Sequence, residues 1–178
     1  MTRRLHIGGT SASPGWEVLN AYPAPYVDHV CNANDLSRFD DDTFAQIYAS
    51  HVVEHLDYKD ELLRTLVEWN RVLVPGGSVL ISVPDLDILS SLLLQKNRFS
   101  IAERYFVMRM IFGGHVDRYD YHAVGLNEDF LGSFLHSSGY INIRRVQSLG
   151  LFADTSSMVF KGVPISLNMI ADKQGPTR

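Results

Sequence analysis

Histidine, glutamate and tyrosine side chains gather in two short segments of this chain. In the first, His51 and His55 flank Glu54 in the pattern H-x-x-E-H, and in the second, GHVDRYDYH, His115 and His122 enclose acidic and tyrosine residues. Histidine is the side chain whose ordinary pKa suits proton transfer near neutral pH, and histidine with glutamate can also hold a metal ion. We therefore take His51, His115 and His122 as candidate catalytic bases. The alternative is that these side chains only hydrogen-bond the second segment to the core.

The elements around the first of these segments form one unit. Residues 46–50 are a short apolar run typical of a buried strand, and residues 59–74 place apolar side chains at helical intervals. A Pro-Gly-Gly turn then ends the helix, because proline cannot extend it and glycine accepts the positive φ of the reversal. Residues 78–83 follow with the pattern of a second strand. This strand–helix–strand order predicts parallel strands in an α/β sheet.

The same unit carries a resemblance to a known family. The segment RVLVPGGSVLISVP resembles the R-x-L-x-P-G-G helix end and fifth strand of class I S-adenosylmethionine (SAM) dependent methyltransferases, in a short variant similar to methyltransferase type 11. IYASHVVEHL resembles their fourth strand and the turn after it, and LHIGGT resembles their first strand and glycine loop. The three segments keep the family's spacing, so the resemblance covers residues 5–83. It implies SAM as cofactor and methyl transfer to a small molecule or an envelope sugar.

The resemblance also implies which residues bind the cofactor. Gly8 and Gly9 follow the first strand, where their backbone would approach the methionine part of SAM. Asn20 stands where the family has an acidic residue that binds the ribose, and Asn32, followed by Ala33, stands where the adenine is bound. Asparagine keeps an acceptor oxygen, but charge-assisted hydrogen bonds are about twice as strong as neutral ones. At about 1 kcal/mol for each bond, we expect cofactor binding to be weakened by roughly tenfold or more.

The acceptor side of such a site is formed by residues after the fourth strand and by late loops. Ser50 and His51 hold the first of these places, and we assign Ser50 to the cofactor and His51, with His115 and His122, to the acceptor. The protein has to align acceptor and methyl group and to remove a proton where the acceptor carries one. The sequence does not name the acceptor or the atom that is methylated.

The rest of the chain completes a single predicted domain over residues 1–178. The connections at residues 8–15 and 20–26 are too short for a crossover helix, which takes about a dozen residues. We therefore predict a Rossmann-like, mostly parallel sheet with a C-terminal antiparallel strand pair, in which the first crossover helices are reduced or absent. A bare sheet face needs a cover, and a homodimer would supply one. The remaining strands are expected at residues 5–7, 16–19, 27–31, 140–146 and 158–170, the helices at 86–95, 101–112 and 127–138, and a polar tail from 172.

Composition excludes several classes of protein. Hydrophobic residues make up 46% of the chain and charged residues 20%, with a net charge of −4, which gives no basic footprint for nucleic acid. Cys31 is the only cysteine, so an intrachain disulfide is excluded. No apolar run reaches the ~18 residues of a membrane span, and the start of the chain has no signal-peptide apolar core. We therefore expect a cytoplasmic protein without a membrane or nucleic-acid partner.

Two other functions compete with methyl transfer. The pattern of His51, Glu54 and His55 is also that of inverzincin zinc proteases, and on a helix the two histidines would lie one turn apart and could share a metal. The segment directly follows a strand rather than lying inside a long helix, so we assign no metal ligands; an auxiliary metal at this segment or at the loop with His115 and His122 stays open. The absence of both acidic cofactor residues also fits a non-catalytic binding or scaffold protein of the same fold.

Overall fold

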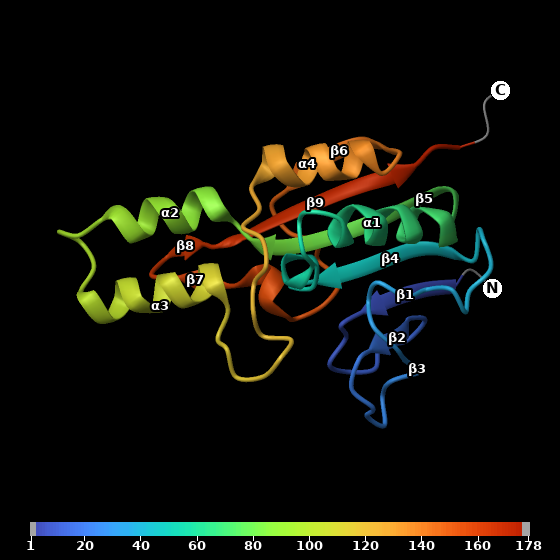
Figure 1. The fold of residues 1–178 in the computed structure, drawn as a ribbon, viewed down its shortest axis with the longest axis horizontal. Coiled ribbons are helices and arrows are strands. Elements are labelled where there is room, and N and C mark those ends of the chain that lie inside the picture. Colours follow the sequence, from blue (N-terminus) through green and yellow to red (C-terminus); the bar gives the residue numbers. More distant parts are fainter. Residues whose placement is uncertain (1–2, 176–178) are drawn as a thin grey trace.

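The computed structural model describes residues 3–175, and within them seven strands form one sheet. Its strand order is β3-β2-β1-β4-β5-β9-β6 (Figure 1). Neighbouring strands among β1 to β5 run parallel, and β9 lies antiparallel between β5 and β6. This is the mostly parallel sheet with an antiparallel closing pair that the sequence predicts. The strands are β1 (Arg3–Ile7), β2 (Glu17–Asn20), β3 (His29–Val30), β4 (Phe44–Ser50), β5 (Leu73–Pro84), β6 (Tyr140–Val146) and β9 (Ser166–Lys173).

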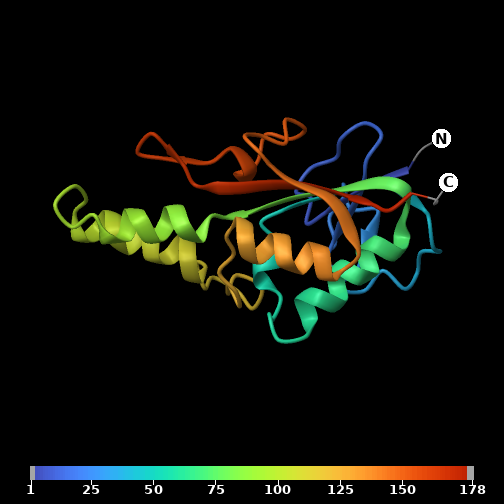
Figure 2. The same cartoon turned by 90° about the horizontal axis from the view of Figure 1, so that it is seen from above.

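The α-helices of the described residues lie on one side of the sheet, as Figure 2 shows. Helix α1 packs Leu62, Leu66 and Trp69 into the core, all fully buried, as its helical periodicity predicts. Helix α4 begins after Asn127, whose side chain accepts a hydrogen bond from the backbone N–H of Phe130, as expected for an N-cap. Within residues 3–175 no helix is long and apolar enough to cross a bilayer. The helices are α1 (Glu61–Val72), α2 (Leu86–Leu94), α3 (Ile101–Phe112) and α4 (Glu128–Ser137).

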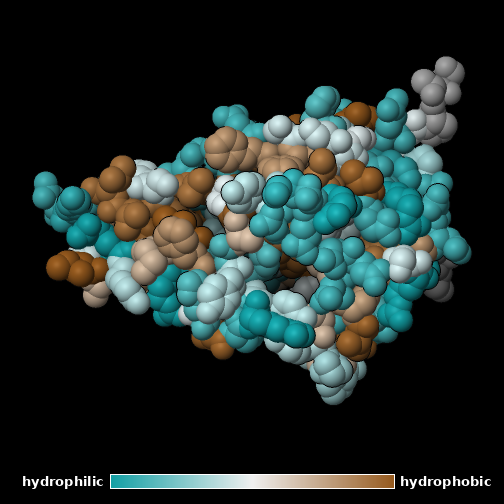
Figure 3. Space-filling model, in the orientation of Figure 1, coloured by the Kyte–Doolittle hydropathy of each residue, from teal (hydrophilic) through white to brown (hydrophobic). Residues whose placement is uncertain are grey.

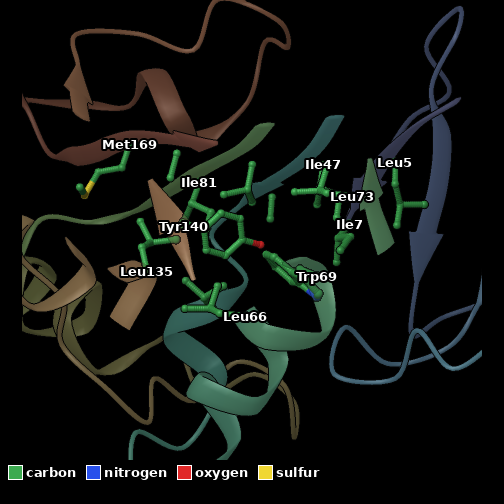
Figure 4. Packing of buried hydrophobic residues seen from close by; sticks show 14 of the residues in the cluster. Leu5, Ile7, Ile47, Leu66, Trp69, Leu73, Ile81, Leu135, Tyr140 and Met169 are labelled. Atoms are coloured by element: carbon green, nitrogen blue, oxygen red, sulfur yellow. The ribbon is translucent and has the colours of Figure 1, made fainter. Parts of the chain in front are cut away.

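The main core lies between these helices and the sheet. Figure 4 shows Ile7 of β1 and Ile47 of β4 in the same cluster as Leu66 and Trp69 of α1. Burial of each such side chain contributes about 1.5–3 kcal/mol to folding. Trp69 also donates its indole N–H to the backbone oxygen of Ala33 at 2.8 Å. The helix core therefore fixes the segment that follows β3, where the sequence places part of the cofactor site.

The opposite face of the sheet is covered without helices. Between residues 3 and 52 of the described chain there is no helix, which confirms that the first crossover helices are absent. Residues 147–157 instead fold over this face, where Phe152 packs against Trp16 and Tyr48. Residues 147–157 thus cover a face of the sheet that the sequence predicted to be bare. The homodimer stays a prediction.

Three predicted elements differ in extent. The strand predicted at residues 158–170 is a short hairpin followed by β9, because Gly162, with φ of +82°, reverses the chain. Strand β3 keeps only two of the predicted residues 27–31. Strand β9 continues to Lys173, whose Nζ donates a hydrogen bond to the backbone oxygen of the first residue of β5 at 2.6 Å. The chain is therefore still part of the sheet where the polar tail was expected to begin. Residues 176–178 of that tail lie outside the described residues. The hairpin strands are β7 (Val159–Phe160) and β8 (Val163–Pro164).

Candidate functional site

A cavity of about 320 Å³ opens at the carboxyl ends of β1, β2 and β4. Figure 3 shows a hollow in this part of the surface, close to where β4 ends. Strand β1 pairs with β2 on one side and with β4 on the other, so the direction in which the chain adds strands reverses at this point. Ligands of open α/β sheets bind in the crevice at such a switch point. The position of the cavity therefore makes it the candidate binding site.

The turn after β1 forms one wall of the cavity. Gly8 has a φ of +76°, and its N–H donates to the backbone oxygen of Leu19 at 2.8 Å. A Cβ atom at this position would lie 2.6 Å from Cγ2 of Val52, so only glycine fits between the two strand ends. Gly9 is buried behind the turn rather than on the cavity wall, and its backbone oxygen accepts a hydrogen bond from Nδ2 of Asn20 at 3.0 Å.

Two asparagines and Ala33 line the adjoining wall. Asn20 ends β2, and its Oδ1 accepts a hydrogen bond from the backbone N–H of Tyr22 at 3.0 Å. Asn32 follows β3, and its Oδ1 accepts from the hydroxyl of Tyr119 at 3.2 Å. An amide oxygen has two lone pairs, so each asparagine retains one for a hydroxyl or amino group of a ligand. The wall therefore offers two neutral acceptors to a ligand that carries hydroxyl or amino groups.

Tyr119 and Glu61 are among the cavity-lining residues that were not assigned to the site from the sequence. Tyr119 comes from the loop of residues 113–125, and its ring lies 5.3 Å from the ring of Tyr22, so the two tyrosines close one side of the opening. Glu61, the first residue of α1, is the one carboxylate among the lining residues, and it accepts a hydrogen bond from Nδ2 of Asn34 at 2.6 Å. Helix α1 follows the turn after β4, so its N-terminus had to lie at this edge of the sheet. That topology was the signal by which Glu61 could have been found.

His51 follows β4 directly and lines the cavity. Its Nδ1 lies 3.4 Å from Oε1 of Glu54, and its Nε2 lies 3.2 Å from the hydroxyl of Ser166. Burial lowers the pKa of His51 to about 4, so its imidazole is neutral at pH 7 and able to accept a proton. Ser50 is not part of the cavity wall, and its hydroxyl lies 3.2 Å from that of Thr155.

The H-x-x-E-H segment does not lie on an α-helix. Val53–His55 form a single 3₁₀ turn, η1, and His51 precedes it in the left-handed conformation with φ of +54°. The two histidines are therefore not one helical turn apart, and the zinc-protease arrangement that the pattern suggests does not form. His55 lines the cavity instead, and its Nδ1 lies 3.1 Å from the backbone oxygen of Tyr121.

The structure brings His122 to this site and leaves His115 outside it. Two backbone N–H groups of the loop donate to the backbone oxygen of Glu54 at 2.8 and 3.2 Å, and the ring of His122 lies 4.9 Å from that of His55. Burial lowers the pKa of His122. His115 is exposed, and its ring stacks on that of Tyr121 at 3.9 Å. Of the three candidate bases, only His51 thus lines the cavity, whereas His122 lies beside His55 and His115 joins neither of them.

Glu54 lies behind the cavity and is only 1% exposed. Burial raises the pKa of its carboxyl group to about 8, because an ionised carboxylate loses its hydration there. Neither carboxylate oxygen makes a hydrogen bond to any of residues 3–175. An unsatisfied acid group therefore stands beside two histidines of the site.

Comparison with known proteins agrees with this geometry. Residues 17–81 match the family model described as a methyltransferase domain. No curated protein matches the chain. Among solved structures, a SAM-dependent methyltransferase from Archaeoglobus fulgidus has a TM-score of 0.60 at 15% identity, covering 97% of this chain and 86% of that one.

Two other solved structures are longer than this chain. A "possible exported protein" from Bordetella parapertussis has a TM-score of 0.60 at 12% identity, covering 98% of this chain and 63% of that one. The CurJ carbon methyltransferase has a TM-score of 0.56 at 16% identity, covering 98% of this chain and 49% of that one. The chain thus spans less than two thirds of these two proteins, and at such identities the likeness shows the fold.

Proposed function

We propose that this chain, part of which matches the methyltransferase-domain family model, is a class I SAM-dependent methyltransferase that binds SAM in the cavity at the ends of β1, β2 and β4 and transfers its methyl group to a small-molecule or sugar acceptor. The observation that carries the choice of site is the position of the cavity at the switch point of the sheet. The acceptor and the roles of single residues are proposals.

Each part of the cofactor meets a different wall in this proposal. The methionine part lies at the turn of Gly8, where no Cβ blocks the approach of the backbone. The remaining lone pair of Asn20 accepts from a ribose hydroxyl, and that of Asn32, next to Ala33, accepts from the adenine amino group. Bound in this way, SAM supplies an electrophilic methyl group.

The protein's own contribution is alignment and proton removal. His51 lies on the cavity wall, its burial keeps it neutral at pH 7, and the hydroxyl of Ser166 is within 3.2 Å of its Nε2. We propose His51 as the base that takes a proton from the acceptor. His122 contacts His55 rather than the cavity, and the exposed position of His115 gives no support to a catalytic role.

Calorimetric titration with SAM and with S-adenosylhomocysteine tests the binding part of this proposal. We expect binding to the native chain and roughly fivefold weaker binding in Asn20→Ala and in Asn32→Ala, because each loses one hydrogen bond of about 1 kcal/mol. Asn97→Ala, in the exposed turn between α2 and α3, is the matched control and should bind as the native chain does. The absence of heat at millimolar ligand contradicts the proposal.

The same titration separates the enzyme from the non-catalytic alternative. Release of S-adenosylhomocysteine in the presence of candidate acceptors supports methyl transfer, and its reduction in His51→Gln with SAM affinity retained supports the base. Binding of SAM without turnover on any small-molecule or sugar acceptor favours a binding or scaffold protein.

The homodimer stays a proposal from the sequence, although residues 147–157 cover the sheet face from which it was inferred. Light scattering at micromolar concentration tests it, and a monomeric mass contradicts it. The cytoplasmic location stays a prediction.

A further inference from the structure

Glu54, His55 and His122 come together behind the cofactor cavity. One candidate ligand atom from each lies within 4.8 Å of the other two. Glu54 is 1% exposed, and neither of its carboxylate oxygens has a hydrogen-bond partner among residues 3–175. Nδ1 of His51 is 3.4 Å from Oε1, but it does not form a hydrogen bond with it. Buried acceptors without partners are rare in folded proteins, so this carboxylate marks a position where a cation or a proton is needed.

The two histidines have their tautomers fixed by the backbone. Nδ1 of His55 lies 3.1 Å from the backbone oxygen of Tyr121, and Nδ1 of His122 lies 3.1 Å from that of Ile111. A carbonyl oxygen can only accept, so each Nδ1 carries the hydrogen and each Nε2 carries the lone pair. Histidines that bind metals make this second hydrogen bond, which holds the ring and leaves the other nitrogen free. Both rings are therefore neutral tautomers in which Nε2 is the nitrogen able to bind a metal ion.

The backbone also holds the two segments of the cluster together. The N–H groups of Ala123 and Val124 donate to the backbone oxygen of Glu54 at 2.8 and 3.2 Å. The contact joins η1 to the loop that carries His122, the residue immediately before Ala123. The acid and the second histidine are thus placed by the same pair of backbone hydrogen bonds.

We propose that Glu54, His55 and His122 bind a divalent transition-metal ion, and that Zn²⁺ fits this donor set. One carboxylate and two imidazoles are the protein ligands of His₂Glu zinc sites, in which a fourth tetrahedral position stays open to water or substrate. The ion compensates the buried carboxylate that the protein leaves without a partner. Because His55 also lines the cavity, the ion lies at the border of the proposed methyl-transfer site. Metal binding does not depend on methyl transfer, and each can be tested without the other.

Zinc titration of the full chain, purified without a histidine tag and treated with EDTA, tests the proposal. We expect one Zn²⁺ per chain, a rise in the melting temperature on its addition, and at least about a hundredfold loss of affinity in Glu54→Gln and in His122→Gln. His136→Gln, on the exposed surface of α4, is the matched control and should bind zinc as the native chain does. Circular dichroism of each variant establishes that it is folded; should Glu54→Gln fail to fold, His122→Gln alone decides.

The outcomes separate this proposal from the function proposed above. No zinc bound at micromolar concentration, or equal affinity in the native chain and in folded His122→Gln, overturns the metal site. In that case the carboxyl of Glu54 is simply a buried protonated acid. The SAM titration is run on the EDTA-treated chain, so its result stands whether zinc binds or not.

Discussion

Two clusters of polar side chains meet at His55 and differ in whether their acceptor atoms have hydrogen-bond partners in the protein. In the cofactor cavity, the amide oxygens of Asn20 and Asn32 already accept hydrogen bonds, from the Tyr22 backbone and the Tyr119 hydroxyl. In the cluster behind it, both carboxylate oxygens of Glu54 have no partner within residues 3–175. The two asparagines of the first cluster are neutral and largely satisfied, whereas the second cluster holds a buried carboxyl group that no hydrogen bond from residues 3–175 satisfies.

The difference shows what each cluster requires of a ligand. A satisfied neutral wall costs little when empty, and a ligand adds only the hydrogen bonds that the remaining lone pairs can make, about 1 kcal/mol each. A buried carboxylate without a partner costs more than that as long as it is charged. It must take up a proton or acquire a cation. The cavity should therefore bind its ligand with modest strength, and the cluster should depend strongly on what occupies it.

The largest expected effect comes from a change in the shape of the cavity wall, which should affect SAM binding and leave zinc binding unchanged. In Gly8→Ala the new Cβ would meet Cγ2 of Val52 at 2.6 Å, at a φ of +76°. Overpacking of this kind costs about 1–3 kcal/mol of folding stability. Because Val52 also lines the cavity, relieving the contact displaces the wall, and SAM affinity measured by calorimetry should fall by up to roughly a hundredfold while zinc affinity is unchanged. Gly76→Ala is the control, because Gly76 has a φ of +79° and no atom within 4 Å of the added Cβ. It carries the same backbone strain, about 1–2 kcal/mol, and should keep SAM affinity. Equal losses in both variants would mean that strain, not the cavity wall, is responsible.

A second prediction concerns His6, a buried side chain that stays neutral and so lacks the cost of an unpaired charge. His6 is 5% exposed, its Nδ1 has no hydrogen-bond partner among the described residues, and burial lowers its pKa to about 4 against the opposing charge of Asp154. The unfolded chain takes up a proton on this ring near pH 6.5, and the folded chain does not. Stability is therefore fully present above pH 6.5 and is lost as the pH falls toward 4. The slope is about 1.4 kcal/mol per pH unit for one histidine.

Urea unfolding at pH 7 and pH 5 measures this loss. His6→Phe keeps a ring beside Tyr48 and Phe152 and removes the titration, so it should lose about 2 kcal/mol less than the native chain over this range. Both chains keep a further acid-dependent loss from His51, whose pKa is also lowered to about 4, so the difference between them reports His6. His136→Phe, at an exposed site of α4, is the control for replacing a histidine by phenylalanine. A slope equal in His6→Phe and native chain contradicts the prediction.

A third prediction restores charge to the neutral wall. Nδ2 of Asn20 donates to the backbone oxygen of Gly9 at 3.0 Å, and an aspartate there would set a carboxylate against a carbonyl. Asn32 makes its hydrogen bond to protein through Oδ1, which an aspartate preserves. Asn32→Asp should therefore tighten SAM binding about fivefold to tenfold, since charge-assisted hydrogen bonds are about twice as strong. Asn20→Asp should weaken it. Calorimetry that finds the same change in both variants would remove the distinction between the two asparagines.

The sequence predicts the parts of the molecule that depend on local patterns. The periodicity of Leu62, Leu66 and Trp69 defines α1, and the helix predicted at residues 127–138 matches α4, because both depend on contacts within a few residues. The short connections in the first third of the chain were enough to predict that crossover helices are missing. The family resemblance and the order of the strands predicted four residues that line or border the cavity: Gly8, Asn20, Asn32 and Ala33.

The parts that could not be predicted depend on contacts between distant segments. Nothing near residues 147–157 indicates that Phe152 packs against Trp16 on the second face of the sheet. The spacing of His51 and His55 suits a helix, but the chain turns left-handed at His51, so the pattern misleads. The approach of His122 to His55 depends on backbone hydrogen bonds to the Glu54 carbonyl, which no side-chain pattern encodes.

The smallest expected effect tests how much SAM binding depends on the hydrogen bond between Tyr119 and Asn32 in the cavity wall. The hydroxyl of Tyr119 donates to Asn32 and accepts from Nη2 of Arg118 at 2.8 Å, and all three residues are at the surface or close to it. Tyr119→Phe removes a hydrogen bond of about 1 kcal/mol or less, but it also frees the second lone pair of Asn32 for the ligand. The two consequences oppose each other, so SAM affinity should change by less than about threefold. Tyr119→Ala also removes the ring that closes the cavity beside Tyr22 and should weaken binding further. A loss in Tyr119→Phe as large as that in Asn32→Ala would mean that the tyrosine hydroxyl itself contacts the ligand. The hydrogen bonds within the cavity wall would then not satisfy its polar groups until the ligand is bound.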